Sequence, residues 1–247
     1  MKVLAGIHPV REALRAEQPV ERVLVARGAA GPRLQEIIEL CRRRGIPLRF
    51  EPRHVLDRLA GETPHQGVAA IGSVARYADA EQVFASARLL VVLDGVEDPH
   101  NLGAIVRTVH ASGADAVLIG QRRAAGLSEA AAKAAAGALA WVPVVRVVNI
   151  SQTLEELKKR GYWIYGLDER GSELYDEVEL REPAALVLGG EGKGLHLNVR
   201  KRCDFLVRIP LAGSISSLNV SVAAGVMLFE WRRRSRARAP EPAAGGR

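Results

Sequence analysis

Apolar residues recur along positions 89–234 in two alternating patterns: short unbroken runs and longer stretches with a helical period. The first run, residues 89–93, reads LLVVL, which is typical of a strand buried on both faces of a parallel sheet. The pattern then predicts helix 100–112, strand 115–119, helix 128–138, strand 142–148, helix 152–160, strands 163–167 and 185–188, helix 193–202, strand 205–209 and helix 216–234. Strands that alternate with helices indicate an α/β domain, with a parallel sheet covered by helices on both faces.

Residues 1–75 predict a separate, smaller α/β unit. The expected elements are helix 8–16, strand 22–26, helix 34–44, and strands 47–51 and 67–71. Residues 76–88 have no clear period and are expected to be a linker, so the larger domain is expected to span residues 89–234. Residues 235–247 lose all apolar periodicity and are predicted to be a disordered basic tail.

The net charge of +7 is concentrated at the two ends of the chain. Residues 1–75 carry 12 Lys and Arg against 8 Asp and Glu, and residues 231–247 carry 6 against 1. The middle of the chain carries 17 against 19. Basic ends favour a polyanionic partner such as RNA. An Arg-rich genome is the alternative explanation of the same excess.

Two classes of protein are disfavoured by the sequence. No apolar run approaches the ~20 residues that span a bilayer, and the first helix is already charged at Arg11, unlike a signal peptide. The two cysteines, Cys41 and Cys203, match no metal-ligand spacing. We therefore expect a cytoplasmic protein with no membrane partner and no metal site.

The first of three polar loops reads DGVEDPHNLG, at residues 94–103, and leads into a predicted helix. Asn101 lies in the first turn of that helix and can both donate and accept hydrogen bonds. Gly103 and Arg107 are four residues apart and share a face, so the glycine leaves the backbone open beside a guanidinium that can bind phosphate or carboxylate. A capped helix with a solvated arginine is the alternative interpretation.

The second loop reads LGGEGKG, at residues 188–194. Gly194 stands where a Walker motif needs Ser or Thr, and the glycine spacing does not match G-x-G-x-x-G. We therefore reject a nucleoside-triphosphate or NAD site. What is left is a strand that ends in an open loop with one carboxylate, Glu191.

The third loop, IPLAGSISSLNVS at residues 209–221, joins a short strand to a long apolar helix. Ser217 and Asn219 lie at the junction, where the unpaired N–H groups of a helix N-terminus can bind polar ligand atoms. Ligands of an open parallel sheet bind outside the carboxyl ends of its strands. We therefore expect the three loops to form one ligand site.

These three loops resemble the motifs of a known family. NLGAIVR at 101–107, LGGEGKG at 188–194 and IPLAGSISSLNVS at 209–221 resemble, in order and spacing, those of the SpoU (TrmH-like) RNA ribose 2′-O-methyltransferases, which belong to the SPOUT class. GIHPVREAL at 6–14 and HQGVAA at 65–70 resemble an L30e-like RNA-binding module. That module precedes the catalytic domain in bacterial enzymes that methylate a guanosine in the peptidyl-transferase region of 23S rRNA.

The resemblance implies a parallel sheet whose C-terminal segment forms a trefoil knot, preceded by an L30e-like domain that binds the RNA substrate. General topology rules would not have led to a knot. It also implies a homodimer and S-adenosylmethionine as methyl donor. The cofactor-binding residues implied in the knot loops are Gly189, Gly190, Ile209, Leu211 and Leu218.

The catalytic residues implied are Arg107, Asn101, Glu191, Ser217 and Asn219. Family mechanisms assign removal of the ribose 2′-hydroxyl proton to the arginine at the position of Arg107. A guanidinium is a poor base because its intrinsic pKa is above ~12. An arginine that is anchored on phosphate and polarises the hydroxyl is an equally physical role. Asn101, Ser217 and Asn219 would hold this arginine and the ribose, and Glu191 would brace the loop or contact an arginine.

Other functions remain open at this point. The substrate could be tRNA or another rRNA site, and the free RNA or a ribosomal precursor. A different class of function is a non-catalytic RNA-binding or ribosome-assembly protein, although the motif residues Asn101, Arg107, Glu191 and Asn219 disfavour it. A metabolic α/β enzyme that acts on a small anion is disfavoured by the basic ends.

Overall fold

The computed structural model describes residues 3–73, 75–192, 194–214 and 217–238. The chain divides into two compact units. The smaller consists of the chain up to Arg76 together with Gly126–Ala132, and the larger consists of Tyr77–Ala125 and the chain from Lys133 onward. In the part of the chain that is described, no helix is long and apolar enough to pass through a membrane.

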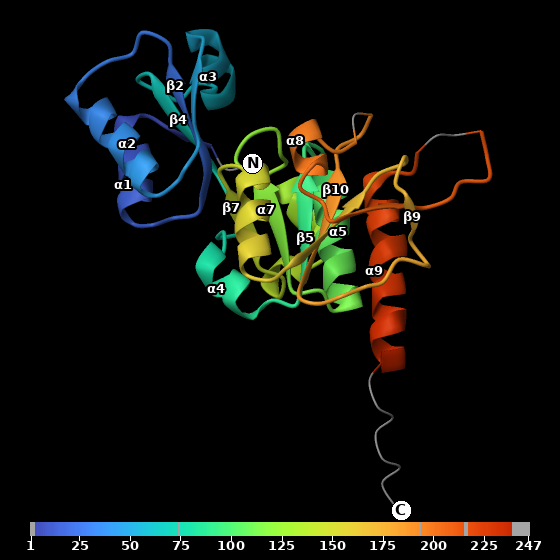
Figure 1. The fold of residues 1–247 in the computed structure, drawn as a ribbon. Coiled ribbons are helices and arrows are strands. Elements are labelled where there is room, and N and C mark those ends of the chain that lie inside the picture. Colours follow the sequence, from blue (N-terminus) through green and yellow to red (C-terminus); the bar gives the residue numbers. More distant parts are fainter. Residues whose placement is uncertain (1–2, 74, 193, 215–216, 239–247) are drawn as a thin grey trace, which may run out of the picture. The chain divides into compact units, whose positions relative to one another are not determined.

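The smaller unit is a four-stranded mixed sheet with helices on both faces (Figure 1). Its strand order is β1-β4-β2-β3, with β2 and β3 parallel and β4 antiparallel to its two neighbours. The elements are β1 (Val3–Ala5), α1 (Ile7–Arg15), β2 (Val20–Ala26), α2 (Pro32–Arg43), β3 (Leu48–Glu51), α3 (Arg53–Ala60) and β4 (Val68–Gly72).

Two separate cores hold this unit together. Helices α1 and α2 bury Val10, Leu14, Ile37 and their neighbours against one face of the sheet. Helix α3 buries Leu56 against the other face, a helix that the sequence pattern had not predicted. Leu56 is its only fully buried side chain, so the eight-residue segment carries little apolar periodicity.

The larger unit is a seven-stranded sheet with the order β7-β6-β5-β10-β8-β11-β9, in which every neighbouring pair is parallel. The α/β class predicted from the sequence is thus confirmed. The elements are α4 (Ala80–Ser86), β5 (Leu89–Asp94), α5 (Pro99–Ser112), β6 (Ala116–Gly120), a 3₁₀ helix (Ala138–Ala140), β7 (Val144–Val147), α7 (Ile150–Lys159), β8 (Trp163–Leu167), β9 (Glu173–Leu174), β10 (Ala184–Gly189), α8 (Leu197–Arg200), β11 (Phe205–Arg208) and α9 (Val220–Arg238). Helix α6 (Glu129–Ala135) is divided between the two units after Ala132.

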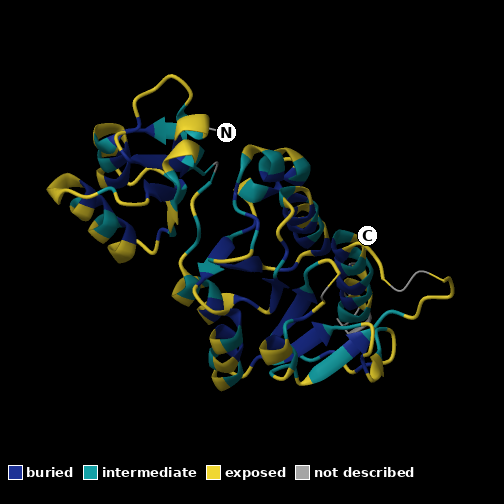
Figure 2. Ribbon diagram, turned by 90° about the horizontal axis from the view of Figure 1, so that it is seen from above, coloured by how far each residue is buried: buried dark blue, intermediate teal, exposed yellow. Residues whose placement is uncertain are grey.

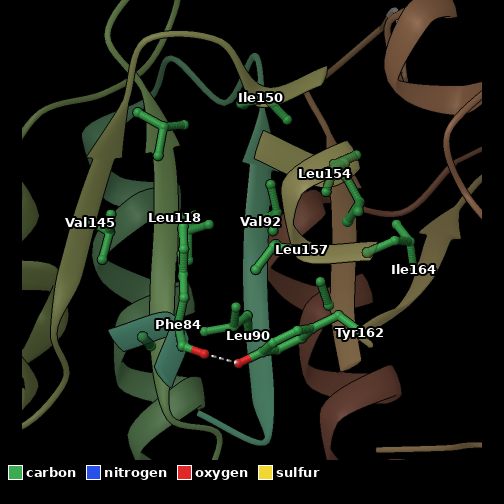
Figure 3. Packing of buried hydrophobic residues seen from close by; sticks show 14 of the residues in the cluster. Phe84, Leu90, Val92, Leu118, Val145, Ile150, Leu154, Leu157, Tyr162 and Ile164 are labelled. Atoms are coloured by element: carbon green, nitrogen blue, oxygen red, sulfur yellow. Dashed lines mark hydrogen bonds between the residues drawn. The ribbon is translucent and has the colours of Figure 1, made fainter. Parts of the chain in front are cut away.

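The strands at the centre of this sheet are buried on both faces, as Figure 2 shows. All six residues of β5 are buried, which is why its sequence is an unbroken apolar run. One face packs against α4, α7 and α8 in a cluster that includes Phe84, Val92 and Leu154 (Figure 3). Tyr162 anchors this cluster because its hydroxyl donates to the backbone oxygens of Phe84 and Ala87, 3.1 and 2.6 Å away.

Helices α5 and α9 lie on the opposite face and contact each other. Helix α5 begins at Pro99 behind the N-cap Asp98, whose carboxylate accepts from the His100 N–H at 2.8 Å. It ends at Gly113, which has a left-handed φ of 81°. Both ends follow from the local sequence, so the helix lies where its pattern predicts.

Several segments of the larger unit differ from the sequence-based expectation. The expected linker, residues 76–88, contains α4, whose Phe84 is buried in the core of the larger unit. Helix 193–202 is reduced to Leu197–Arg200, since Gly192 and Gly194 take positive φ values before it. Helix 128–138 ends at Ala135, and α9 continues to Arg238, into the segment expected to be disordered. Residues 239–247 of that tail lie outside the described residues. The trefoil knot stays a prediction.

Candidate active site

The carboxyl ends of four parallel strands meet at one edge of the larger sheet. Strands β5, β10, β8 and β11 are consecutive neighbours, and they end at Asp94, Gly189, Leu167 and Arg208. The three polar loops singled out in the sequence follow β5, β10 and β11. The expectation that they would come together is therefore met by the topology of the sheet.

Three side chains from the three loops form a hydrogen-bonded cluster. The Asn101 amide donates to Glu191 Oε1 at 2.7 Å. The Asn219 amide is shared between Asn101 Oδ1 at 3.0 Å and Glu191 Oε1 at 3.1 Å. We call these three residues the polar triangle. Each of the three side chains is hydrogen-bonded to the other two, so the triangle fixes the relative positions of the three loops.

The backbone around each member of the triangle is itself held in place. Asn101 is buried in the first turn of α5. Asn219 lies directly before α9, and its Oδ1 accepts from the backbone N–H and the hydroxyl of Ser221, at 2.9 and 2.6 Å. This is the geometry of a side chain that caps a helix N-terminus. The amide of Asn219 is therefore oriented toward Glu191 by the helix start.

Two glycines at the end of β10, Gly189 and Gly190, lie too close to neighbouring backbone to accept side chains. A Cβ on Gly190 would lie 2.1 Å from the backbone oxygen of Gly95, and one on Gly189 would lie 2.1 Å from the carbonyl carbon of Gly194. The Gly190 N–H donates to the Asp94 backbone oxygen at 2.8 Å. Glycine is required here because backbone packs on backbone.

A second pair of residues, Asp94 and His196, fixes the C-terminal end of the same loop. The buried carboxylate of Asp94 accepts from the His196 backbone N–H at 2.7 Å and contacts His196 Nδ1 at 2.9 Å. Asp94 thus holds both ends of the loop that carries Glu191. Sequence reasoning missed this pair, because 102 residues separate its members and nothing local signals the contact.

Beside the triangle lies a cavity of about 810 Å³. Its lining includes all five residues predicted to bind the cofactor, namely Gly189, Gly190, Ile209, Leu211 and Leu218. Glu191, Ser217 and Asn219 line it as well. Two further charged residues line the cavity and were not predicted from the sequence: Asp168 accepts a hydrogen bond from Arg200 Nε at 2.8 Å. No group of three or more His, Cys, Asp or Glu residues suited to a metal ion occurs in the described part of the chain.

Arg107 does not join this assembly. Its side chain is exposed on α5, and it is not among the residues that line the cavity. Asn101 lies six residues earlier on the same helix, so the two Cα atoms are separated by about 9 Å along the axis. Of the five residues predicted to be catalytic, three line the cavity, namely Glu191, Ser217 and Asn219. Asn101 is bonded to two of these through the triangle, and Arg107 lies apart.

Comparison with known proteins identifies the family of this fold and site. A model described as the SpoU rRNA Methylase family matches residues 88–229. A model described as RNA 2′-O ribose methyltransferase substrate binding matches residues 3–78. The chain belongs to the SpoU rRNA methylase family. As a member of it, the chain is an RNA ribose 2′-O-methyltransferase by family, and its smaller unit corresponds to the substrate-binding domain.

Individual relatives and solved structures that are similar to this SpoU family member are also RNA methyltransferases or RNA-modifying enzymes by name. YacO of Bacillus subtilis, assigned to the TrmH family of tRNA/rRNA methyltransferases, is 39% identical over 237 residues, covering 93% of this chain and 95% of YacO. The AdoMet-bound rRNA methyltransferase from Sinorhizobium meliloti matches with a TM-score of 0.61 and 25% identity, over 94% of this chain and 87% of that one. The A. aeolicus TrmH/SpoU tRNA modifying enzyme matches with a TM-score of 0.57 and 32% identity, over 62% of this chain and 78% of that one.

Proposed function

We propose that this protein methylates the ribose 2′-hydroxyl of a guanosine in the peptidyl-transferase region of 23S rRNA, in the cytoplasm. The observation that carries the proposal is the polar triangle of Asn101, Glu191 and Asn219 at the side of the 810 Å³ cavity. It joins a cofactor-sized pocket to hydrogen-bonding groups that can position a hydroxyl.

S-Adenosylmethionine is the methyl donor, and it supplies a methyl group made electrophilic by the sulfonium. The cavity fits it in size, since ligand pockets enclose roughly 300–1,000 Å³. The apolar side chains of Ile209, Leu211 and Leu218 offer a surface for an adenine ring. The Glu191 carboxylate offers a negative charge beside a cationic ligand.

The residues of the triangle would act by holding the reacting groups in place. Transfer in line requires the hydroxyl oxygen and the methyl carbon at near-contact distance, and fixed hydrogen-bond donors provide that geometry. Ser217 and Asn219 are the polar groups on the α9 side of the cavity that can contact a ribose. Glu191 braces the loop through its bonds to both asparagines.

Arg107 would serve the cavity of a second subunit. Its guanidinium is exposed on α5 and has no hydrogen bond or ion pair within the described part of its own chain. A homodimer in which α5 faces the partner would bring this fork of donors to the ribose and phosphate. In that position it polarises the hydroxyl, and the proton leaves to solvent or phosphate.

The choice of rRNA as the substrate rests on the presence of the smaller unit, because a match over nearly the whole chain has to include that unit. The rRNA methyltransferase from S. meliloti matches 94% of this chain, whereas the tRNA modifying enzyme matches 62%. A substrate in tRNA is the second candidate, favoured by the 32% identity to that enzyme. A non-catalytic RNA-binding role would leave the triangle without a function.

Labelled methyl transfer tests this proposal. The protein is incubated with methyl-labelled S-adenosylmethionine and unmodified 23S rRNA, 16S rRNA or tRNA, and the product is mapped as an alkali-resistant linkage. We expect one labelled guanosine in 23S rRNA. Label in tRNA would retain the reaction and change the substrate. Absence of label with every RNA, including ribosomal precursors, while the cofactor binds, would reject the enzymatic proposal.

A matched pair of variants tests the triangle itself. Asn101→Asp removes the amide donor and places a second carboxylate 2.7 Å from Glu191, so we expect methyl transfer to fall by about 100-fold. Asn198→Asp makes the same change at an exposed position on α8 and should leave the rate unchanged. Equal rates in both variants would show that the triangle does not position the reaction.

A further inference from the structure

The most exposed tryptophan of the larger unit is Trp141, which has 75% of its surface accessible. The other two tryptophans are held by the protein: Trp231 is 3% exposed, and Trp163 packs against Phe205. Large aromatic side chains are strongly favoured by burial, so an indole in water is costly. A single exposed indole is not by itself a binding site, so its neighbours decide what it can bind.

The backbone that carries Trp141 is fixed. It follows the 3₁₀ helix Ala138–Ala140, and its N–H donates to the Ala138 oxygen at 3.0 Å. The next residue, Val142, is buried and leads into β7. The indole therefore projects from a rigid corner of the fold, which limits the entropy lost when a partner binds it.

The neighbours of the indole are polar. Trp141 stacks on the imidazole of His110, with ring centroids 6.2 Å apart and an interplanar angle of 20°. His110 lies on α5, and both its side chain and that of Arg107 are exposed. The two residues are three positions apart, so they lie on the same face of the helix. An aromatic ring, an imidazole and a guanidinium thus share one surface.

We propose that Trp141 is a stacking platform for a base of the RNA substrate, with His110 supporting the indole and Arg107 directed to the ribose and phosphate of the same segment. Sequence-selective RNA recognition uses unstacked bases that stack on aromatic side chains, with arginine on the backbone. The inference rests on the proposed function, because it assigns the RNA contact of the same reaction.

In the proposed dimer a second copy of this chain would contact α5 and α9, but it is a less suitable occupant of the indole itself than RNA. The indole stacks on His110, and Arg107 lies three residues earlier on the same face of α5, so both polar side chains suit a nucleotide. The apolar positions suited to a protein partner lie on α9, where Val222 and Phe229 are each 52% exposed. The positive charge of Arg107 on this face of α5 therefore favours the polyanion.

Three variants test the platform in the full-length protein, with the RNA that the wild type methylates. Trp141→Ala should weaken RNA binding by about tenfold or more, and Trp141→Phe, which keeps a ring, should restore most of it. The control is Val148→Ala, at an apolar residue 77% exposed, which should bind as the wild type. S-Adenosylmethionine binding should be unchanged in all three, which separates RNA contact from loss of folding.

Tryptophan fluorescence gives an independent readout. RNA should quench the emission of the wild type, and the quench should be lost in Trp141→Phe because the two remaining tryptophans are packed within the protein. Unchanged RNA affinity in Trp141→Ala would overturn the proposal. So would a change from dimer to monomer in that variant, since the indole would then be a subunit contact. A wild type that binds S-adenosylmethionine but methylates no RNA would instead reject the proposed function.

Discussion

At the scale of the single residue, the glycines of the second loop determine whether the cavity can form. Gly190 is the clearest case, because a Cβ there would lie 2.1 Å from the Gly95 oxygen, and backbone cannot move aside as a side chain can. The same contact holds the loop that carries Glu191. The geometry of this loop therefore depends on the absence of a side chain at Gly190.

We therefore expect Gly190→Ala to raise the Kd for S-adenosylmethionine by about tenfold or more, with a smaller effect on thermal stability. Gly213→Ala is the matched control, since a Cβ at Gly213 would meet nothing within 4 Å and should leave the Kd unchanged. Isothermal titration calorimetry with both variants measures the difference. Wild-type affinity in Gly190→Ala would show that the loop can shift without cost to the cofactor site.

Most residues of the site could be predicted from the local sequence, but some of the contacts between them could not. The motif residues Asn101, Glu191 and Asn219 were identified from local sequence, and the parallel sheet brings them together. The contact between Asp94 and His196 could not be found in this way, since it depends on two loops that the fold makes adjacent. The distance of Arg107 from the cavity depends on the rotation of α5, which the sequence pattern does not specify to one residue.

At the scale of the element, α9 is tied to the rest of its unit by charge as well as by burial. Glu230 forms ion pairs with Arg233 at 2.8 Å and Arg234 at 2.6 Å. Arg234 also donates to the backbone oxygens of Tyr175 and Val178, 3.2 and 2.6 Å away. The network fixes the C-terminal half of the helix against the segment after β9.

The hydrogen bond from Arg233, followed by that from Arg234, lowers the pKa of Glu230 to about 2. A lowered pKa contributes stability that is present above the usual value near 4.5 and is lost as the pH falls toward 2. Glu230→Gln should therefore destabilise the protein at pH 7 by about 1–2 kcal/mol, allowing for solvent screening.

Thermal unfolding at pH 7 and at pH 3 measures this effect. The difference in Tm between the wild type and Glu230→Gln should be largest at pH 7 and should shrink at pH 3. Glu177→Gln, an exposed carboxylate on the segment that Arg234 contacts, should show little difference at either pH. A difference that did not depend on pH would assign the role of Glu230 to packing.

Elements with a strong period were predicted well, and short elements were not. Strands β5, β6, β8, β10 and β11 lie within about one residue of their predicted bounds because their apolar runs are continuous. Strand β9 has only two residues and carries no pattern of its own. The sequence pattern does not predict helix α4, because one aromatic residue, Phe84, provides most of its burial.

At the scale of the whole molecule, α9 presents an apolar surface that the described part of its own chain leaves exposed. Val222 and Phe229 are each 52% exposed and lie seven residues apart, hence on one face of the helix. Helix α9 also contacts α5, the helix that carries Arg107. A homodimer through these helices would bury the apolar face and deliver Arg107 to a second cavity.

Phe229→Glu should therefore halve the mass measured by light scattering and reduce methyl transfer by at least tenfold, while each monomer still binds S-adenosylmethionine. Phe50→Glu is the matched control, since Phe50 lies in the smaller unit and is 54% exposed. Its mass should equal that of the wild type. A monomeric wild type with full activity would reject the shared site.

The polar triangle also has a consequence for how the protein is made. Its members stand at positions 101, 191 and 219, so the first of them leaves the ribosome 118 residues before the last. The residues that line the cavity lie between Leu167 and Ala223, so they also leave the ribosome late. A nascent chain can therefore complete its smaller unit and several strands of the larger sheet before any cofactor pocket exists. Cofactor binding is then a property of the finished polypeptide, and a prematurely terminated chain cannot sequester S-adenosylmethionine.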